Sequence, residues 1–183
     1  MPKGRIIAGI DVGTEKICTI IASVSEETNR VNVIGVSSQP STGLRKSQIV
    51  DIEEAISAIT ESVEAAERMA GLSLQNAFVS ISGNQIQSQN SKGVVAVSEP
   101  EGEIIPEDVS RVIDTARAGS LPASREILHV IPRVFVVDSQ EGLKASVVMT
   151  GVILEAEAQF ITAATGSTKN LTKCISETGI NIN

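Results

Sequence analysis

The sequence predicts an α/β chain of α+β character, in which a β-β-β-α-β unit is followed by further strands covered by one helix. Three β-rich runs joined by short polar turns open the chain at residues 5–10, 17–24 and 31–37. Short turns between successive strands favour antiparallel hairpins. Residues 152–162 alternate between apolar and polar side chains, which is typical of a sheet with one face in water.

The helix of the first unit is predicted from its start, its apolar face and its end. Asp51 is placed to cap it, and Glu54 stands three residues later, as in a capping box. Gly71 lies where a left-handed residue commonly ends a helix. Residues 77–82 then predict a strand buried beneath this helix. The apolar side chains that recur at helical spacing are Ile52, Ala55, Ile56, Ile59, Val63, Ala66 and Met69.

The composition of the chain changes after Gly83. Residues 84–91 are polar and rich in Gln, so the next strand is expected only at residues 93–97. Pro106 opens a second helix, because proline suits the first turn. Gly119 is expected to end that helix.

The remaining segments complete a small α+β unit and return to a helix. Residues 126–138 predict a long strand, and Pro132 within it predicts a sheet edge or a bulge. Ser167 is expected to cap a third helix, and residues 180–183 resemble the start of another strand.

Composition argues against several classes of function. The chain has 15 basic and 22 acidic residues, a formal charge of −7 and 2% aromatic residues. It therefore offers neither the basic patch nor the stacking side chains of a nucleic-acid binder. The single histidine, His129, is expected to be structural, and the separated Cys18 and Cys174 to be reduced and buried. Because no long apolar run predicts a membrane span, the chain is expected to be cytoplasmic.

The segment with the clearest chemistry covers residues 10–16, where a buried strand delivers Asp11 and turns at Gly13. Glycine permits a positive φ and a close approach of backbone to ligand, and successive amides in such a turn can bind phosphate. Asp11 would face a hydrated Mg²⁺ on those phosphates, while Thr14 and Lys16 would add donors. The alternative is a plain hairpin in which Asp and Gly only make the turn, because short Gly motifs are common.

In this setting the segment resembles the first phosphate loop of the actin, hexokinase and Hsp70-type ATPase superfamily. Within that superfamily the chain is similar, nearly from end to end, to the FtsA family of bacterial cell-division proteins. The motifs that carry the resemblance are residues 9–16 (GIDVGTEK), 33–36 (VIGV), 40–43 (PSTG), 49–53 (IVDIE), 79–83 (VSISG), 128–132 (LHVIP), 138–142 (DSQEG) and 151–155 (GVILE).

The resemblance implies an actin-like, ribonuclease H-like architecture in three segments. Residues 1–83 would be the first part of subdomain 1A, residues 84–165 an inserted small α+β domain called 1C, and residues 166–183 an incomplete return into subdomain 1A. The chain would then stop before the second lobe of the nucleotide site.

The resemblance also assigns ligands to the turn. Asp11, Gly13 and Thr14 match the family's first phosphate loop, with ATP and Mg²⁺ as ligands of the complete protein and Mg²⁺ held by Asp11 through water. Glu15 departs from the small hydroxyl residue that the family often has there, and it is expected to point away from phosphate. Alone, the chain is not expected to close around ATP.

For the complete protein, the resemblance implies a weak ATPase that forms filaments and tethers the FtsZ ring to the cytoplasmic face of the inner membrane at the division site. It implies that residues 84–165 recruit later division proteins, and that a C-terminal amphipathic helix beyond residue 183 holds the membrane. Two alternatives remain open: a phosphotransferase of the same superfamily, such as a sugar kinase, and a fragment that acts only as a protein-interaction module.

Acidic side chains gather on the second part of the chain. Glu155 and Glu157 share a strand face and are expected to be solvated rather than a catalytic pair. A second group is expected to form an exposed acidic rim, which serves solubility or docks a basic partner. That group consists of Glu99, Glu101, Glu103, Glu107 and Asp108.

Overall fold

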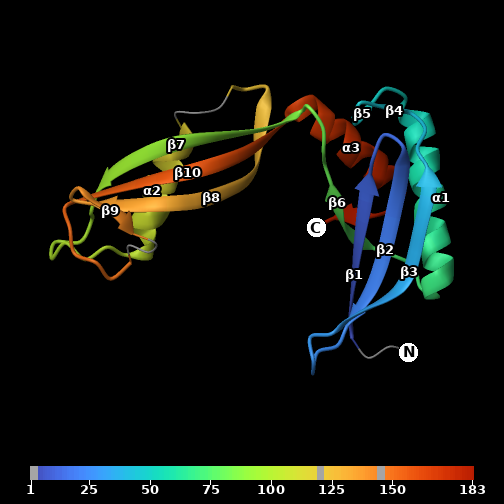
Figure 1. The fold of residues 1–183 in the computed structure, drawn as a ribbon, viewed down its shortest axis with the longest axis horizontal. Helices are drawn as coiled ribbons and strands as arrows, with labels where there is room; N and C mark the ends of the chain where they lie inside the picture. Colours follow the sequence, from blue (N-terminus) through green and yellow to red (C-terminus); the bar gives the residue numbers. More distant parts are fainter. Residues whose placement is uncertain (1–3, 119–121, 144–146) are drawn as a thin grey trace. The chain divides into compact units, whose positions relative to one another are not determined.

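The computed structural model describes residues 4–118, 122–143 and 147–183, and it divides into two compact units (Figure 1). The first unit comprises Met1–Gln85 and Gly166–Asn183, and the second comprises Ile86–Thr165. The second unit is thus inserted into the sequence of the first.

The first unit is built on a five-stranded sheet with the order β11-β6-β1-β2-β3. The strands β1, β2 and β3 are antiparallel, as predicted from their short turns. Both β6 and β11 join the sheet in parallel, with β6 beside β1, and a separate hairpin is formed by β4 and β5. The bounds are β1 Arg5–Val12, β2 Lys16–Val24, β3 Val31–Pro40, β4 Leu44–Arg45, β5 Gln48–Ile49, β6 Asn76–Ser80 and β11 Asn181–Ile182.

Helix α1 (Ile52–Ala70) covers one face of this sheet (Figure 1), and both of its predicted caps are confirmed. Asp51 accepts a hydrogen bond from the Glu54 amide at 3.0 Å, and Gly71 takes a left-handed φ of 69°. Gly35 of β3 lets the helix approach closely, because a Cβ at that position would lie 2.4 Å from the Ala66 carbonyl oxygen.

Helix α3 (Thr165–Glu177) begins earlier than predicted. Ser167 was expected to cap it, and this is wrong because strand β10 runs directly into the helix. The Thr165 amide donates to the Ser124 carbonyl at 3.0 Å. The first amide of the helix is therefore satisfied by the carbonyl of a residue that is distant in sequence.

The core of the first unit contains one of the two cysteines. Cys174 of α3 is buried in this core with its Sγ 4.0 Å from the Ile52 carbonyl oxygen, and burial raises the pKa of its thiol. Cys18 is only half-buried, because Ile17 and its alternating partners Thr19 and Ile21 face α1 and leave Cys18 on the opposite face. The expectation that Cys18 is buried in the core is therefore wrong.

The second unit is a four-stranded antiparallel sheet with the order β7-β10-β8-β9, and helix α2 covers one face (Figure 1). Strand β7 already begins at Ile86, so the expectation that residues 84–91 precede the strand is wrong. Pairing with β10 over eleven residues overrides the polar composition of that run. The predicted helix end at Gly119 lies outside the described residues. The bounds are β7 Ile86–Ala96, α2 Pro106–Ala118, β8 Arg125–Val137, β9 Gln140–Leu143 and β10 Ile153–Ala164.

The alternation predicted for residues 152–162 is confirmed from Leu154 onward, but Val152 precedes β10 and is 71% exposed. Leu154, Ala156, Ala158 and Phe160 are buried against α2, and the intervening side chains are partly exposed. Pro132 of β8 pairs with Ala158 at a register shift, which confirms the predicted bulge. A bulge tolerates proline because it leaves one residue of the strand outside the ladder.

Asp108 is the exception among the acidic residues expected on the surface, because it is fully buried. Its carboxylate accepts hydrogen bonds from the Ser98 amide and hydroxyl, from the Ile105 amide at 3.2 Å and from Arg111 at 2.5 Å. Burial raises the pKa of Asp108, but these hydrogen bonds outweigh it and hold the pKa below its ordinary value. Asp108 therefore joins the start of α2 to the loop after β7.

In the described part of the chain, no helix combines the length and apolar character that a membrane crossing requires. The same residues contain no group of three or more His, Cys, Asp or Glu side chains arranged to hold a metal ion by themselves.

Candidate functional site

Asp11 lies at the carboxyl end of β1, beside the carboxyl end of the parallel strand β6. Its direct partner in the strand register is Ser80, and the Ser80 hydroxyl donates a hydrogen bond to Asp11 Oδ1. The carboxylate is otherwise exposed and has acceptor capacity left on both oxygens. Ligands of open α/β sheets bind outside the carboxyl ends of parallel strands, so Asp11 stands where such a ligand would be.

The turn after Asp11 is closed by a hydrogen bond from the Gly13 amide. The Gly13 amide donates to the Lys16 carbonyl at 3.0 Å, and Gly13 does not adopt the positive φ expected for it. A Cβ at Gly13 would lie 3.0 Å from that same carbonyl oxygen, so glycine serves the close approach within the hairpin. The Gly13 amide is committed to the hairpin, and the side chains predicted to contact a ligand at this turn are Asp11, Thr14 and Lys16.

Thr14 is tied to the β4–β5 hairpin. The Ser47 amide donates to Thr14 Oγ1 at 2.8 Å, and Gln85 Nε2 donates to the Ser47 carbonyl at 2.8 Å. Lys46 and Ser47 both have left-handed backbones, with φ of 51° and 59°, a conformation that costs non-glycine residues about 1 kcal/mol or more each. A hydroxyl oxygen that accepts from an amide keeps its own proton to donate. The hairpin therefore holds the Thr14 oxygen in place and leaves its proton available to donate, with Ser47 Oγ 3.5 Å away.

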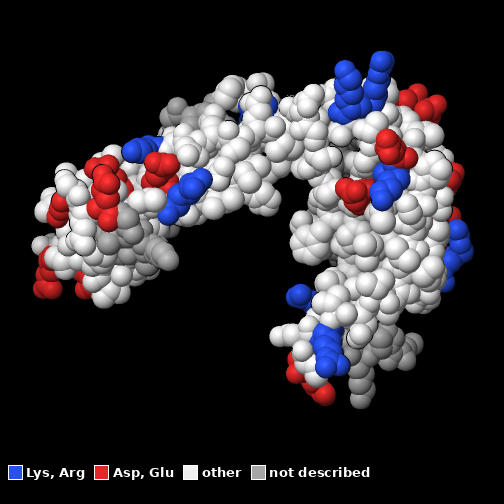
Figure 2. Space-filling model, in the orientation of Figure 1, with Lys and Arg blue, Asp and Glu red and all other residues white. Residues whose placement is uncertain are grey.

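Cations surround this edge of the first unit. Lys16, Arg45 and Lys46 are exposed, and Figure 2 shows Lys and Arg side chains gathered over the β4–β5 hairpin. Exposed cations beside an oriented hydroxyl favour an anionic ligand. The exposed Asp11 carboxylate fits a hydrated Mg²⁺ paired with that anion, since Mg²⁺ keeps most of its waters and takes one or two carboxylates.

Removal of the Thr14 hydroxyl tests whether it supports the hairpin. In Thr14→Val the Ser47 amide loses its acceptor, and two left-handed residues lose a restraint. We expect local opening of the turn to become easier by about 1.4 kcal/mol, so hydrogen exchange at the Ser47 amide should be about tenfold faster. Thr28→Val, in another exposed turn, is the matched control. An unchanged exchange rate at Ser47 would show that the bond to Thr14 contributes nothing.

Two contributors to the site, Ser47 and Ser80, were missed by sequence reasoning. Ser80 sits near the end of a predicted strand, and its proximity to Asp11 follows only from the parallel pairing of β6 with β1. Ser47 lies 33 residues after Thr14 in a hairpin with no sequence signal of its own. The amide of Ser47 makes the contact, and any residue other than proline supplies an amide.

Comparison with known proteins gives matches over both units. A family model described as "SHS2 domain inserted in FTSA" matches residues 83–162. The "Cell division protein FtsA" of Borreliella burgdorferi is 41% identical over 96% of this chain and 42% of its own length. The proteins of the same name from Pseudomonas aeruginosa and Bacillus subtilis are 36% and 38% identical, over 98% and 100% of this chain. The chain spans about four tenths of the length of these relatives, 42% and 41% for the latter two.

A solved structure supports the fold. A chain in the "PilM-PilN type IV pilus biogenesis complex" superposes with a TM-score of 0.64, covering 96% of this chain and 45% of that one. The sequence identity is 11%, so this likeness concerns the fold alone.

Proposed function

We propose that this chain, which is related over nearly its whole length to the FtsA cell-division proteins, supplies the first phosphate-binding loop of an ATP site. One observation carries the proposal: at the carboxyl ends of β1 and β6, Ser80 holds the Asp11 carboxylate while Ser47 orients the Thr14 hydroxyl. A carboxylate at the end of β1 and an oriented hydroxyl three residues later, in the turn that follows, suit a metal-bound phosphate.

Each residue of the turn has a separate task in this proposal. Asp11 accepts hydrogen bonds from the waters of Mg²⁺, and the bound ion supplies charge neutralisation at the phosphates. The Thr14 hydroxyl donates to a phosphate oxygen, and the Lys16 ammonium adds positive charge. Gly13 keeps the hairpin tight enough to place Thr14 beside Ser47. The remaining contacts to nucleotide belong to parts of the relatives that this chain does not cover.

The activities of the complete protein are also proposals. By analogy with the family, we propose that the first unit is part of an actin-like subdomain 1A and that residues 84–165 are domain 1C, which contacts later division proteins. We further propose weak ATPase activity, filament formation and tethering of FtsZ to the inner membrane for the complete protein. The match of residues 83–162 to an SHS2 domain described as inserted in FtsA supports the proposal that residues 84–165 form a separate inserted domain.

Asp11→Asn in the complete protein tests the nucleotide site. Asparagine keeps an oxygen for the Ser80 hydroxyl but removes the charge that attracts hydrated Mg²⁺. We expect ATP binding measured by calorimetry to weaken by about tenfold or more with Mg²⁺ present, and to change little in EDTA.

Glu15→Gln is the matched control, because it removes the same charge from the same exposed turn. It should leave ATP affinity within about twofold, since Glu15 is proposed to point away from phosphate. Equal affinities for wild type and Asp11→Asn would refute the role of Asp11. Phosphorylation of an added sugar would instead favour the phosphotransferase alternative.

A further inference from the structure

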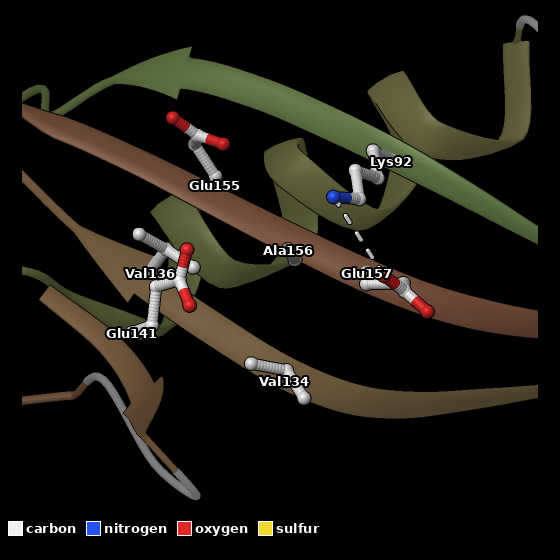
Figure 3. Close-up of a pocket in the computed structure, with 7 residues that line it drawn as sticks. All are labelled: Lys92, Val134, Val136, Glu141, Glu155, Ala156 and Glu157. Atoms are coloured by element: carbon white, nitrogen blue, oxygen red, sulfur yellow. Dashed lines mark ion pairs between the residues drawn. The ribbon is translucent and has the colours of Figure 1, made fainter. Parts of the chain in front are cut away.

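The open face of the second unit's sheet, on the side away from α2, contains a hollow of about 430 Å³. Its floor is aliphatic, formed by Val134, Val136 and the backbone at Ala156, and charged side chains surround that floor (Figure 3). The charged residues are Lys92, Glu141, Glu155 and Glu157.

The strand register explains why these side chains gather. Glu155 and Glu157 are two residues apart on β10, so both point to the same face. They pair with Val136 and Val134 of β8 on one side, and Glu157 pairs with Lys92 of β7 on the other. Glu141 reaches the hollow from β9 (Figure 3). Four strands thus contribute to one surface, which makes its geometry as rigid as the sheet.

The hollow carries an excess of negative charge over an exposed apolar floor. Three carboxylates face one ammonium, and Lys92 lies 3.9 Å from Glu157 with 72% of its side chain exposed. Such a surface ion pair is worth at most about 1 kcal/mol, so a competing cation can replace Lys92. The apolar surface extends along the same sheet, with Val94 and Ile131 51% and 43% exposed. Contiguous apolar surface rimmed by charge is typical of a binding site for another protein.

We propose that this hollow docks a segment of another protein in which aliphatic side chains are flanked by Lys or Arg. The aliphatic groups would lie on Val134 and Val136, and the cations would pair with the three carboxylates. Two copies of this hollow do not fit against each other, because each presents three carboxylates and one ammonium and like charges oppose association. This inference rests on the proposal that residues 84–165 contact other proteins. It does not depend on the nucleotide site.

A defined peptide can test this surface on the full chain. The probe is an acetylated and amidated hexapeptide of alternating Lys and Val, titrated into ¹⁵N-labelled protein at low salt. Saturable shifts are expected at the amides of Lys92, Val134, Glu155 and Glu157. The triple variant Glu141→Gln, Glu155→Gln, Glu157→Gln should weaken binding by about tenfold or more, because each lost ion contact is partly desolvated by the peptide.

The matched control removes the same number of charges from the acidic loop of the same unit. Glu99→Gln, Glu101→Gln, Glu103→Gln should change affinity by less than about threefold, since exposed rim charges act mainly at long range. A second probe that replaces Val by Ser should bind at least about fivefold more weakly, because it loses contact with the aliphatic floor.

Three other outcomes would overturn the proposal. If both triple variants weaken peptide binding equally, the peptide is attracted by the net charge of the protein alone and not by the hollow. Equal binding of the Ser-containing peptide would exclude a role for the floor, and shifts confined to the free edge of β7 would mean strand addition instead of docking in the hollow. If the triple variant loses the dispersed spectrum of the folded chain, Glu155→Gln alone should still weaken binding by about threefold. Intact ATP binding by the complete triple variant would separate this result from the nucleotide site.

Discussion

Replacement of Gly93 by Ala is expected to destabilise the second unit by about 3 kcal/mol, at the upper end of the usual cost of overpacking. Gly93 lies in β7 directly under α2, and a Cβ there would lie 2.1 Å from the Val112 carbonyl oxygen and 2.7 Å from the Ala116 nitrogen. Both atoms belong to the helix backbone, so no side-chain rotation relieves the clash. The helix must move off the sheet and lose contact with Leu154, Ala156 and Phe160 on the buried face.

Calorimetry and far-ultraviolet circular dichroism measure this effect directly, whereas intrinsic fluorescence does not, because the chain has no Trp and no Tyr. The control is Gly9→Ala in β1, where an added Cβ meets nothing within 4 Å and the backbone needs no positive φ. Gly9→Ala should leave both units within about 0.5 kcal/mol of wild type. Similar losses in the two variants would indicate a general cost of substituting strand glycines, with no special contact between β7 and α2.

Replacement of Asp108 by Asn is expected to cost the second unit about 2–4 kcal/mol, because hydrogen bonds to a buried charged group are individually strong. The carboxylate only accepts hydrogen bonds, and both of its oxygens are used. An amide would turn an N–H₂ group either toward the Ile105 amide or toward the Ser98 amide and Arg111, placing donor against donor. Asp114→Asn on the same helix is the control, because Asp114 is largely exposed and its pairing with Arg117 at 3.9 Å is a surface contact.

The destabilisation caused by Asp108→Asn should become smaller as the pH falls. The pKa of Asp108 is lower in the folded chain than in the unfolded one, so its stabilising contribution is complete above the unfolded value of about 3.9. The difference in unfolding free energy between wild type and Asp108→Asn should stay constant from about pH 7 to pH 5 and shrink below about pH 4. A difference that grows in acid would contradict the lowered pKa.

Several features of the fold were predictable because they depend on neighbours in sequence. The caps of α1 at Asp51 and Gly71 are local hydrogen-bond and backbone patterns, and both are confirmed. The alternation along β10 follows from the two-residue period of a strand. Matched motifs in order along the chain predicted the resemblance to the FtsA family, and the relatives at 32–41% identity confirm it.

The errors have a common cause in long-range pairing. The polar residues 86–91 form a strand because β10 offers a complete ladder of partners. Ser167 is not a cap because β10 continues into α3. Asp108 carries the same charge as its exposed neighbours, and only the approach of Ser98 and Arg111 makes its burial favourable.

The sequence by itself determined the order of the three helices and of the longer strands, the antiparallel hairpins, the capped helix and the turn that carries Gly13, Thr14 and Lys16 after Asp11. These depend on periodicity, capping and turn chemistry within a few residues. Only the tertiary structure brought Ser80 and Ser47 to that turn and gathered four strands around the hollow of the second unit. Such contacts depend on which strands pair and in what register. Which strands pair depends on the burial of complete sheet and helix faces. Those faces are assembled from segments that lie far apart in the sequence, so no short stretch of sequence determines them.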